Sequence, residues 1–457
     1  MGLDAPIVNR TLSEPAPPPP GALGTVAIHT HGCKLNQADS NLLARQFQAA
    51  GYRVVDSVAE ADVFVLNTCT VTANADAKAR QALRAAHRRN PRAFIVAAGC
   101  YPQRAEAELS QLDAVSLVVG NTGKDQLVRL VLAARHQTSK APYATGGAGP
   151  EAAPLVLTPA ATGGRSRAMI KIQEGCNQVC AYCIVPRVRG RERSIHPDLL
   201  VGQVRQRVAE GYREVVLTGT QLGSYGFDIP GADLRQLLER ILTETDLPRL
   251  RVSSLQPQEI SARLLDLWRD QRLCPHFHIP LQSGSAAILR AMRRRYDPEL
   301  FARTVALVRQ TLPAAGITAD LIVGFPGEGE AEFLETRDLV DSLAFSDMHI
   351  FPYSRRPGTS AAHLTEVIPE TVKKERVAEL LRVARQGFEA FRQGQTGQTR
   401  PVLWESRRMT LGQLRWTGLT DNYIRVHCDS AGDLRHRITP ARILNREGDS
   451  VRAEPLS

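Results

Sequence analysis

The sequence predicts a three-part α/β protein, with an N-terminal parallel-sheet domain, a central partial (β/α)6 barrel and a small C-terminal β-barrel. Three observations predict this order. Short apolar strands alternate with helical stretches over residues 23–135, and six further strand and helix units follow over residues 167–390. Residues 391–457 then alternate as short strands separated by turns. Residues 136–166, rich in Gly, Pro, Ala and Thr, indicate a linker between the first two parts.

The composition suits a soluble globular protein. The chain has 457 residues, of which 43% are hydrophobic, and it has no run of 18 apolar residues. The Pro-rich residues 1–22 lack the order of a signal peptide and predict a disordered tail. We therefore expect a cytoplasmic protein with no membrane partner. In that reducing compartment, eight cysteines favour metal or redox chemistry over a disulfide framework.

The charge favours a polyanionic partner. The formal net charge is +10, and basic residues cluster in three places, namely 78–92, 187–193 and 290–295. Each cluster taken alone also fits a solvated helix face or loop. Three such clusters close to a reactive centre favour a phosphate-rich substrate.

Three cysteines of the first part each end an apolar strand. TVAIHTHGC ends at Cys33, ADVFVLNTC at Cys69 and AFIVAAGC at Cys100. Ligands of an open parallel sheet gather at the carboxyl ends of its strands, so we expect the three thiols to converge. A metal site is the interpretation that we prefer to three separately buried packing cysteines. His29 and His31 lie close to Cys33, and we prefer a role in strand or loop packing to metal ligation for both.

The string KIQEGCNQVCAYCIVPRVRGRERS places Cys176, Cys180 and Cys183 at C-x3-C-x2-C spacing directly after the first barrel strand. Three thiolates on one loop hold a 4Fe–4S cluster with one iron left open, whereas zinc takes a fourth protein ligand that this loop lacks. Iron–sulfur is therefore preferred to zinc, and a disulfide is the weakest alternative. Cys274 and Cys428 have no such spacing and are expected to be structural.

Polar and glycine-rich residues follow the other predicted barrel strands, where a barrel of this type binds its ligands. GFPGE follows the fifth strand, and HFHIPLQSGS contains the fourth. His276 and His278 share one face of that strand, and a hydrogen-bonding pair is preferred to a metal pair. The candidate cofactor-binding residues at the strand ends are Gly219, Gln221, Ser254, Gln282, Ser283, Gly324, Phe325 and Pro326.

The tail combines basic and aromatic residues. Its short strands include LRWTGLTDNYIRVHCD, and aromatic rings can stack on bases while arginines bind phosphate. At least one of Trp404 and Trp416 is expected in the core of this small barrel instead. The candidate RNA-binding residues are Arg415, Trp416, Tyr423 and Arg425.

These motifs together resemble one family. C-x3-C-x2-C is the signature of the radical S-adenosylmethionine (SAM) enzymes, and GCNQVCAYCIVPRVRGRE resembles their methylthiotransferase branch. HGCKLNQADSN, NTCTVT and AAGCYPQ resemble the three cysteine motifs of the N-terminal domain of that branch, which implies a flavodoxin-like sheet and a second 4Fe–4S cluster held by Cys33, Cys69 and Cys100. GLTDNYIRV resembles the TRAM domain that ends such enzymes. After the second barrel strand the chain departs from the common Gly-Gly-Glu and has LTGTQLGSYG instead.

The resemblance implies a tRNA-modifying enzyme. CKLNQ and NTCTVT look like the branch that methylthiolates carbon 2 of N6-threonylcarbamoyladenosine at position 37 of tRNA, with two SAM molecules and two 4Fe–4S clusters. One SAM methylates a sulfur at the auxiliary cluster, and the other yields a 5′-deoxyadenosyl radical after an electron arrives from a donor such as flavodoxin or ferredoxin. The alternatives are a methylthiotransferase acting on isopentenyladenosine in tRNA or on ribosomal protein S12, and a non-catalytic iron–sulfur RNA-binding protein.

Overall fold

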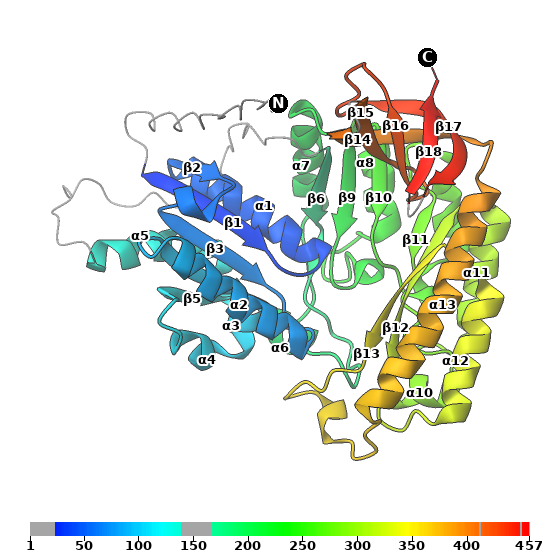
Figure 1. Cartoon of the computed structure of the whole chain (residues 1–457), viewed down its shortest axis with the longest axis horizontal. Coiled ribbons are helices and arrows are strands. Elements are labelled where there is room, and N and C mark those ends of the chain that lie inside the picture. The colour runs from blue at the N-terminus through cyan, green and yellow to red at the C-terminus, as the bar shows by residue number, and fades with distance from the viewer. Residues whose placement is uncertain (1–22, 139–165, 411–412, 448–449, 457) are drawn as a thin grey trace, which may run out of the picture.

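The computed structural model describes residues 23–138, 166–410, 413–447 and 450–456 (Figure 1). The predicted disordered tail, residues 1–22, and most of the predicted linker, residues 136–166, lie outside these described residues. No helix within the described ranges is both long enough and apolar enough to span a membrane.

The first part is a parallel five-stranded sheet with helices on both faces. The strand order is β2-β1-β3-β4-β5, which confirms the flavodoxin-like prediction. Its strands are β1 (Gly24–Thr30), β2 (Tyr52–Val55), β3 (Val63–Thr68), β4 (Phe94–Gly99) and β5 (Leu117–Gly120), and its helices are α1 (Lys34–Ala49), α2 (Ala73–Arg89), α3 (Cys100–Arg104), α4 (Glu106–Ser110) and α5 (Leu127–Thr138). The predicted sheet contained β1, β3 and β4, whereas the short edge strands β2 and β5 were not foreseen.

Alternating apolar side chains of β3 hold the two helical layers. Phe64 and Leu66 pack with α2, α3 and α4 on one face, while Val63 and Val65 pack with α1 and α5 on the other. A strand buried on both faces reads as a continuous apolar run, as VFVL does here.

The second part is an incomplete barrel of six parallel strands, as predicted (Figure 1). β10, β9 and β6 form one sheet and β11, β12 and β13 form another, and bridges such as Ser254 to His278 join the two. The strands are β6 (Arg167–Lys171), β9 (Glu214–Thr218), β10 (Arg249–Val252), β11 (His276–His278), β12 (Gly316–Val323) and β13 (Asp347–Pro352). A two-stranded ribbon of β7 (Gln173–Glu174) and β8 (Arg193–Ser194) flanks the cysteine loop.

Helices cover the outside of this barrel. They are α7 (Pro197–Ala209), α8 (Leu234–Glu244), α9 (Ala262–Leu265), α10 (Ala286–Ala291), α11 (Pro298–Thr311), α12 (Glu330–Leu343) and α13 (Glu370–Gly394), whereas the short α6 (Val185–Arg189) lies against α3 of the first part. One large apolar cluster lies between them and the strands, with Phe301, Leu321 and Leu238 fully or almost fully buried. The inner face of the sheet is left for polar side chains.

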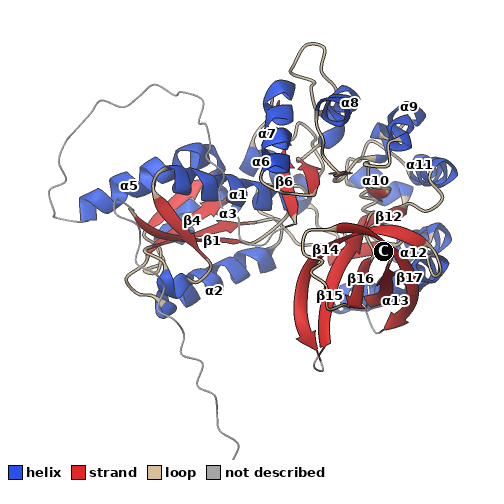
Figure 2. Ribbon diagram, turned by 90° about the horizontal axis from the view of Figure 1, so that it is seen from above, coloured by secondary structure: helices blue, strands red, loops and turns tan. Residues whose placement is uncertain are grey.

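The third part is a closed five-stranded barrel in the order β14-β15-β16-β18-β17, which agrees with the predicted small β-barrel (Figure 2). Its strands are β14 (Thr399–Thr410), β15 (Gln413–Thr420), β16 (Arg425–Asp429), β17 (Ile438–Glu447) and β18 (Ser450–Pro455). Trp404 and Trp416 are both fully buried in its core.

The third part covers the amino-terminal end of the central barrel through a buried ion-pair cluster. Glu214 accepts from Arg249 Nε at 2.5 Å and from Arg251 Nε at 3.0 Å, and all three side chains are almost fully buried. Arg249 also donates to the carbonyls of Leu419 and Thr420, at 3.0 Å each, at the end of β15. The opposite, carboxyl-terminal end of the strands remains for the cysteine loop.

Candidate active site

The C-x3-C-x2-C loop leaves the first barrel strand through a sharp turn. Gly175 has a φ of +78°, and a Cβ at this position would collide with the carbonyl of Arg191, so glycine is required. Cys176, Cys180 and Cys183 follow on one loop ahead of α6. The predicted three-thiol arrangement is therefore local in the fold as well as in the sequence.

The chemistry of this loop fits an iron–sulfur cluster. The backbone N–H of Gln178 donates to Cys176 Sγ at 3.4 Å, and Arg294 Nη1 donates to Cys180 Sγ at 3.3 Å. Such N–H···S bonds stabilise and tune clusters. Burial raises the pKa of the Cys176 thiol to about 11 and that of Cys183 to about 12. These thiols keep their protons until a metal replaces them.

The second set of cysteines converges at the carboxyl edge of the N-terminal sheet. Cys33 caps α1, Cys69 follows β3 and Cys100 begins α3. A Cβ on Gly32 would lie 2.8 Å from Cys69 Cβ, so the first two chain segments are in contact. Thr68 of β3 pairs with Gly99 of β4, so Cys69 and Cys100 follow neighbouring positions of adjacent strands. Burial raises the pKa of Cys69 to about 12. The geometry fits a second three-thiol site.

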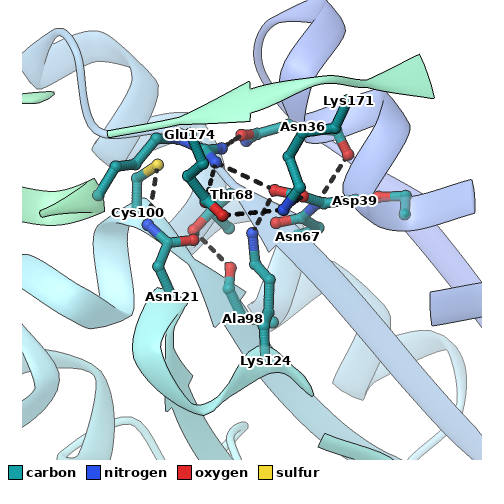
Figure 3. Close-up of polar contacts among 12 residues, drawn as sticks. Asn36, Asp39, Asn67, Thr68, Ala98, Cys100, Asn121, Lys124, Lys171 and Glu174 are labelled. Carbon is teal, nitrogen blue, oxygen red and sulfur yellow. Dashed lines mark hydrogen bonds and ion pairs between the residues drawn. The ribbon is translucent and has the colours of Figure 1, made fainter. Parts of the chain in front are cut away.

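Two N–H groups aim at this second site. The backbone N–H of Val71 donates to Cys69 Sγ at 3.4 Å, and Asn121 Nδ2 donates to Cys100 Sγ at 3.4 Å (Figure 3). Asn121 also donates to the carbonyl of Val188 at 2.6 Å, on α6, directly after the other cysteine loop. One amide side chain therefore connects the two cysteine sites.

A buried ion-pair network, formed by Asp39, Lys124, Lys171, Arg189 and Glu174, fixes the two sites relative to each other. Figure 3 labels Asp39, Lys124, Lys171 and Glu174 of this network. Asp39 on α1 pairs with Lys124 at 2.7 Å, Lys171 at 2.9 Å and Arg189 at 3.2 Å. Arg189 also pairs with Glu174 at 2.7 Å. Burial alone would raise the pKa of Asp39, but the three cations hold it well below its ordinary value.

The network corrects one interpretation of the sequence. Arg189 belongs to the basic run 187–193 that was expected to face phosphate, but its side chain is only 3% exposed and is fully engaged with carboxylates and the Asn36 amide. Arg189 is therefore unavailable to RNA. Local charge density alone did not reveal two of its partners, Asp39 and Asn36, which lie 150 and 153 residues away in the chain.

Replacing Asp39 by alanine should destabilise the protein strongly, because three buried cations would lose their shared carboxylate. We expect a loss of about 3–5 kcal/mol of unfolding free energy, the usual cost of breaking a buried pair. Chemical denaturation measures this loss, and the exposed Asp113→Ala is the matched control, expected to stay within about 0.5 kcal/mol of the parent. Equal midpoints for the two variants would contradict the importance of the network.

The strand-end residues predicted to bind cofactor fall into two groups. Gly219, Gln221, Ser254, Gln282 and Gly324 lie where the strands end or just beyond, as expected. Gln221 bonds to Glu259, and Gln282 adopts a φ of +68° with no side-chain hydrogen bond to the described part of the chain. These positions remain candidates for SAM contacts.

The other group is turned away from the inner face. Ser283 Oγ lies 3.2 Å from Thr336 Oγ1 and is fully buried against α12. Phe325 packs edge-to-face on Tyr353, at a centroid distance of 5.4 Å, and clusters with Ala181 of the cysteine loop. Pro326 is likewise buried. Ser283 and Phe325 thus support the loop through packing, and their side chains do not point at an open cofactor site.

Arg294 is a site residue, although it lies in the basic run 290–295 that was expected to face phosphate. Besides Cys180 Sγ, it donates to the OH of Tyr182 at 3.4 Å and to Gln256 Oε1, and the cation lies 4.7 Å from the centroid of the Tyr296 ring. An arginine with these partners belongs to the cysteine loop. No local signal distinguishes it from Arg293 and Arg295, because the distinction comes from tertiary contacts alone.

The two histidines of HFH do not form a metal pair. His276 is buried and stacks on Tyr423 with centroids 4.2 Å apart, while His278 Nε2 lies 3.1 Å from Asp320 Oδ1. This agrees with the preferred hydrogen-bonding role for His278. His29 packs edge-to-face on Phe64 at 5.0 Å, as expected for a structural residue, and Cys274 and Cys428 are buried free thiols.

The candidate RNA-binding residues of the tail are not equivalent. Trp416 is fully buried, so its ring offers no face to a base, and the expectation that it stacks on RNA is wrong. Tyr423 is held between His276 and Arg251, whose guanidinium carbon lies 4.9 Å from the ring centroid. Arg415 pairs with Asp429 at 2.9 Å, and Arg425 is exposed. The arginines remain candidates for phosphate contacts.

Sequence signatures of two known families match this chain. Residues 25–120 match the uncharacterized protein family UPF0004, and residues 170–340 match the Radical SAM superfamily. In solved structures, the radical SAM methyltransferase TsrM from Kitasatospora setae, with cobalamin and a [4Fe-4S] cluster bound, aligns with a TM-score of 0.53. That alignment covers 74% of this chain and 76% of TsrM at 16% identity, which is a likeness of fold alone.

Full-length relatives are more informative. The threonylcarbamoyladenosine tRNA methylthiotransferase MtaB of Bacillus subtilis is 36% identical over 94% of this chain and 97% of its own length. MtaB of Aquifex aeolicus is 39% identical over 88% of this chain and 96% of its own length. The tRNA-2-methylthio-N(6)-dimethylallyladenosine synthase of Syntrophobacter fumaroxidans is 33% identical over 94% of this chain and 95% of its own length. Both cysteine sites lie within the aligned domains. The chain therefore belongs to the MtaB-like radical SAM methylthiotransferase family.

Proposed function

We propose that the protein transfers a methylthio group to carbon 2 of N6-threonylcarbamoyladenosine at position 37 of tRNA. The observation that carries this proposal is the pairing of two separate three-cysteine sites, joined by Asn121 and by the Asp39 network. One site alone would suffice for SAM cleavage, whereas sulfur transfer needs a second place to hold sulfur. The MtaB relatives, whose name states this substrate, support the choice of nucleoside.

The Cys176, Cys180 and Cys183 thiolates would hold a 4Fe–4S cluster with an open iron for SAM, and Cys33, Cys69 and Cys100 would hold the auxiliary cluster. When bound, these groups supply the electron transfer, the radical and the sulfur chemistry. The chain itself positions the reacting groups and shields them from water. Asn121 and Arg189 fix the distance between the sites, and Arg294 fixes Cys180.

The fold shields most of the cysteines from water. Cys100 and Cys176 are almost fully buried, Cys69, Cys180 and Cys183 are partly covered, and Cys33 is exposed. We also propose that electrons arrive from a flavodoxin or ferredoxin, and that the protein works in the cytoplasm, where its tRNA substrate is found.

A parallel assay on two tRNAs tests the choice of substrate. Reconstituted protein, SAM and a reductant are incubated with tRNA carrying either threonylcarbamoyladenosine or dimethylallyladenosine, and nucleosides are analysed by mass spectrometry. We expect 2-methylthio product from the first tRNA only. Product from the second tRNA alone would favour the alternative function, methylthiolation of isopentenyladenosine, which the name of the relative in Syntrophobacter fumaroxidans supports. No 5′-deoxyadenosine in either reaction would point to a non-catalytic RNA-binding protein.

Exposed arginines of the tail barrel should contribute phosphate contacts. Arg408 and Arg425 are both exposed, and Arg408 lies on the β14–β15 arm that projects from the barrel (Figure 2). The double variant Arg408→Ala/Arg425→Ala should bind tRNA more weakly and reduce the salt slope by about 2, since two fewer counterions are released. Filter binding across salt concentrations measures both effects. Arg269→Ala, on an exposed side chain of the central barrel, is the control and should leave the slope unchanged.

A further inference from the structure

The inner face of the central barrel carries a hydrogen-bonded chain of polar side chains that cluster binding does not use. Ser254 Oγ lies 2.6 Å from His278 Nδ1, and His278 Nε2 lies 3.1 Å from Asp320 Oδ1. His349 Nδ1 lies 3.1 Å from the same Asp320 oxygen. This series of hydrogen bonds crosses four neighbouring strands of the barrel, from Ser254 at one end to His349 at the other.

Strand register places these side chains on the concave face. Asp320 pairs with His349 between β12 and β13, and Ser254 pairs with His278. Met348 and Ile350 pack into the apolar core beneath the helices, so alternation turns His349 to the other face. The side chain of His349 is 59% exposed, and its Nε2 has no hydrogen-bond partner among the described residues. Asp320 therefore holds the His349 ring in place, and the Nε2 atom of that ring is left without a hydrogen-bond partner among the described residues.

A lysine of the N-terminal part reaches the same region. Lys34 follows Cys33, and its Nζ lies 5.7 Å from the centroid of the Tyr423 ring. Lys34 is half-buried, and it forms no ion pair with a carboxylate of the described residues. Tyr423 in turn stacks on His276, with ring centroids 4.2 Å apart, and His276 lies on the same face of β11 as His278, so Lys34 approaches the inside of the barrel.

These groups favour an anion over a metal ion. The ligand atoms of His278, Asp320 and His349 lie within 4.8 Å of one another, which is close enough for a metal. However, both ring nitrogens of His278 already have partners, and Lys34 adds positive charge nearby. The hydrogen bond that His349 donates to the Asp320 carboxylate raises the pKa of His349, which favours the imidazolium form. A lysine without a carboxylate and an open imidazole are the usual partners of a carboxylate.

We infer that Lys34 and His349 form the subsite that receives the carboxylate of the N6-threonylcarbamoyl group. The inference rests on the proposed function and adds how this substrate is selected. A threonylcarbamoyl group ends in a carboxylate and a hydroxyl, whereas a dimethylallyl group has no polar atom. Binding an apolar substituent would leave Lys34 and His349 desolvated without a partner, so the subsite also rejects the wrong nucleoside. Phe351, two residues after His349 and 45% exposed, provides an aromatic surface beside it.

The test uses the reconstituted full-length protein with His349→Gln, Lys34→Met and the conservative Lys34→Arg. We expect His349→Gln and Lys34→Met each to raise KM for tRNA carrying threonylcarbamoyladenosine about tenfold or more, the loss expected for one charge-assisted hydrogen bond. Lys34→Arg should recover most of this loss because it keeps the charge. His363→Gln, at an exposed histidine outside the barrel interior, is the matched control and should leave KM unchanged.

A second readout is independent of turnover. Competition by the free nucleoside and by its carboxyl methyl ester measures the preference for the charged form in each variant. We expect parent protein to prefer the acid and both charge-removing variants to lose that preference, while iron content and 5′-deoxyadenosine formation without tRNA stay at parent levels. An unchanged preference for the acid in His349→Gln and Lys34→Met overturns the subsite. Parent protein that modifies only tRNA carrying dimethylallyladenosine overturns the proposed function instead.

Discussion

Replacing Cys176, Cys180 and Cys183 together by alanine is expected to abolish 5′-deoxyadenosine formation from SAM. These thiols are the three on one loop that follow a barrel strand. The open iron that binds SAM would be lost with them. Chromatography of the reaction products after reduction by dithionite measures the effect, and at least a thousandfold fall to background is expected.

The control for this variant is Cys428→Ala, which also removes a buried free thiol but lies in the tail barrel. It should cleave SAM at the parent rate. Affinity for tRNA should survive in the triple variant, since its basic surfaces are untouched. Continued 5′-deoxyadenosine formation by the triple variant would show that this loop does not hold the SAM-cleaving cluster.

Replacing Cys33, Cys69 and Cys100 by alanine should separate SAM cleavage from sulfur transfer. These three lie on the N-terminal sheet and should hold the auxiliary cluster, so the variant should retain about half of the iron. SAM cleavage should continue at the remaining cluster, while the methylthio product disappears completely. Iron analysis, 5′-deoxyadenosine yield and modified-nucleoside yield are measured on the same preparation.

This second variant distinguishes two interpretations of the N-terminal cysteines. Full iron content together with normal methylthio product would mean that the three are packing residues, as free cysteines often are. Loss of SAM cleavage as well would mean that the N-terminal site supports the barrel site structurally, through Asn121 or the Asp39 network. Only retained cleavage with lost transfer supports two clusters with separate roles.

Much of the fold was predictable because the signals were local. Short apolar strands ended by glycine or cysteine marked β1, β3 and β4, and the six barrel strands coincide with the predicted ones. The edge strands β2 and β5 were not predicted, because YRVV and LVVG are too short to show the alternation of apolar and polar residues that marks a strand. The convergence of Cys33, Cys69 and Cys100 followed from parallel-sheet geometry alone.

The site was less predictable where long-range pairing decides the outcome. Arg189 and Arg294 lie in basic runs of the kind that usually form a solvated surface. Both side chains are buried instead, because each bonds to partners on other elements of the fold. Trp416 has the aromatic and basic neighbours of an RNA-stacking residue but fills the core of its barrel. His349 carries no local signal, because its open nitrogen depends on Asp320 of the neighbouring strand.

The nucleoside profile of tRNA from cells with and without this chain shows directly which adenosine derivative the protein modifies. Mass spectrometry of the digested tRNA should show 2-methylthio-N6-threonylcarbamoyladenosine replaced by its precursor when the chain is absent, while 2-methylthio-isopentenyladenosine stays constant. Restoring the chain should restore the product, and restoring either triple cysteine variant should not. Unchanged 2-methylthio-N6-threonylcarbamoyladenosine in cells that lack the chain, with any loss confined to the isopentenyl derivative, would contradict the proposed function.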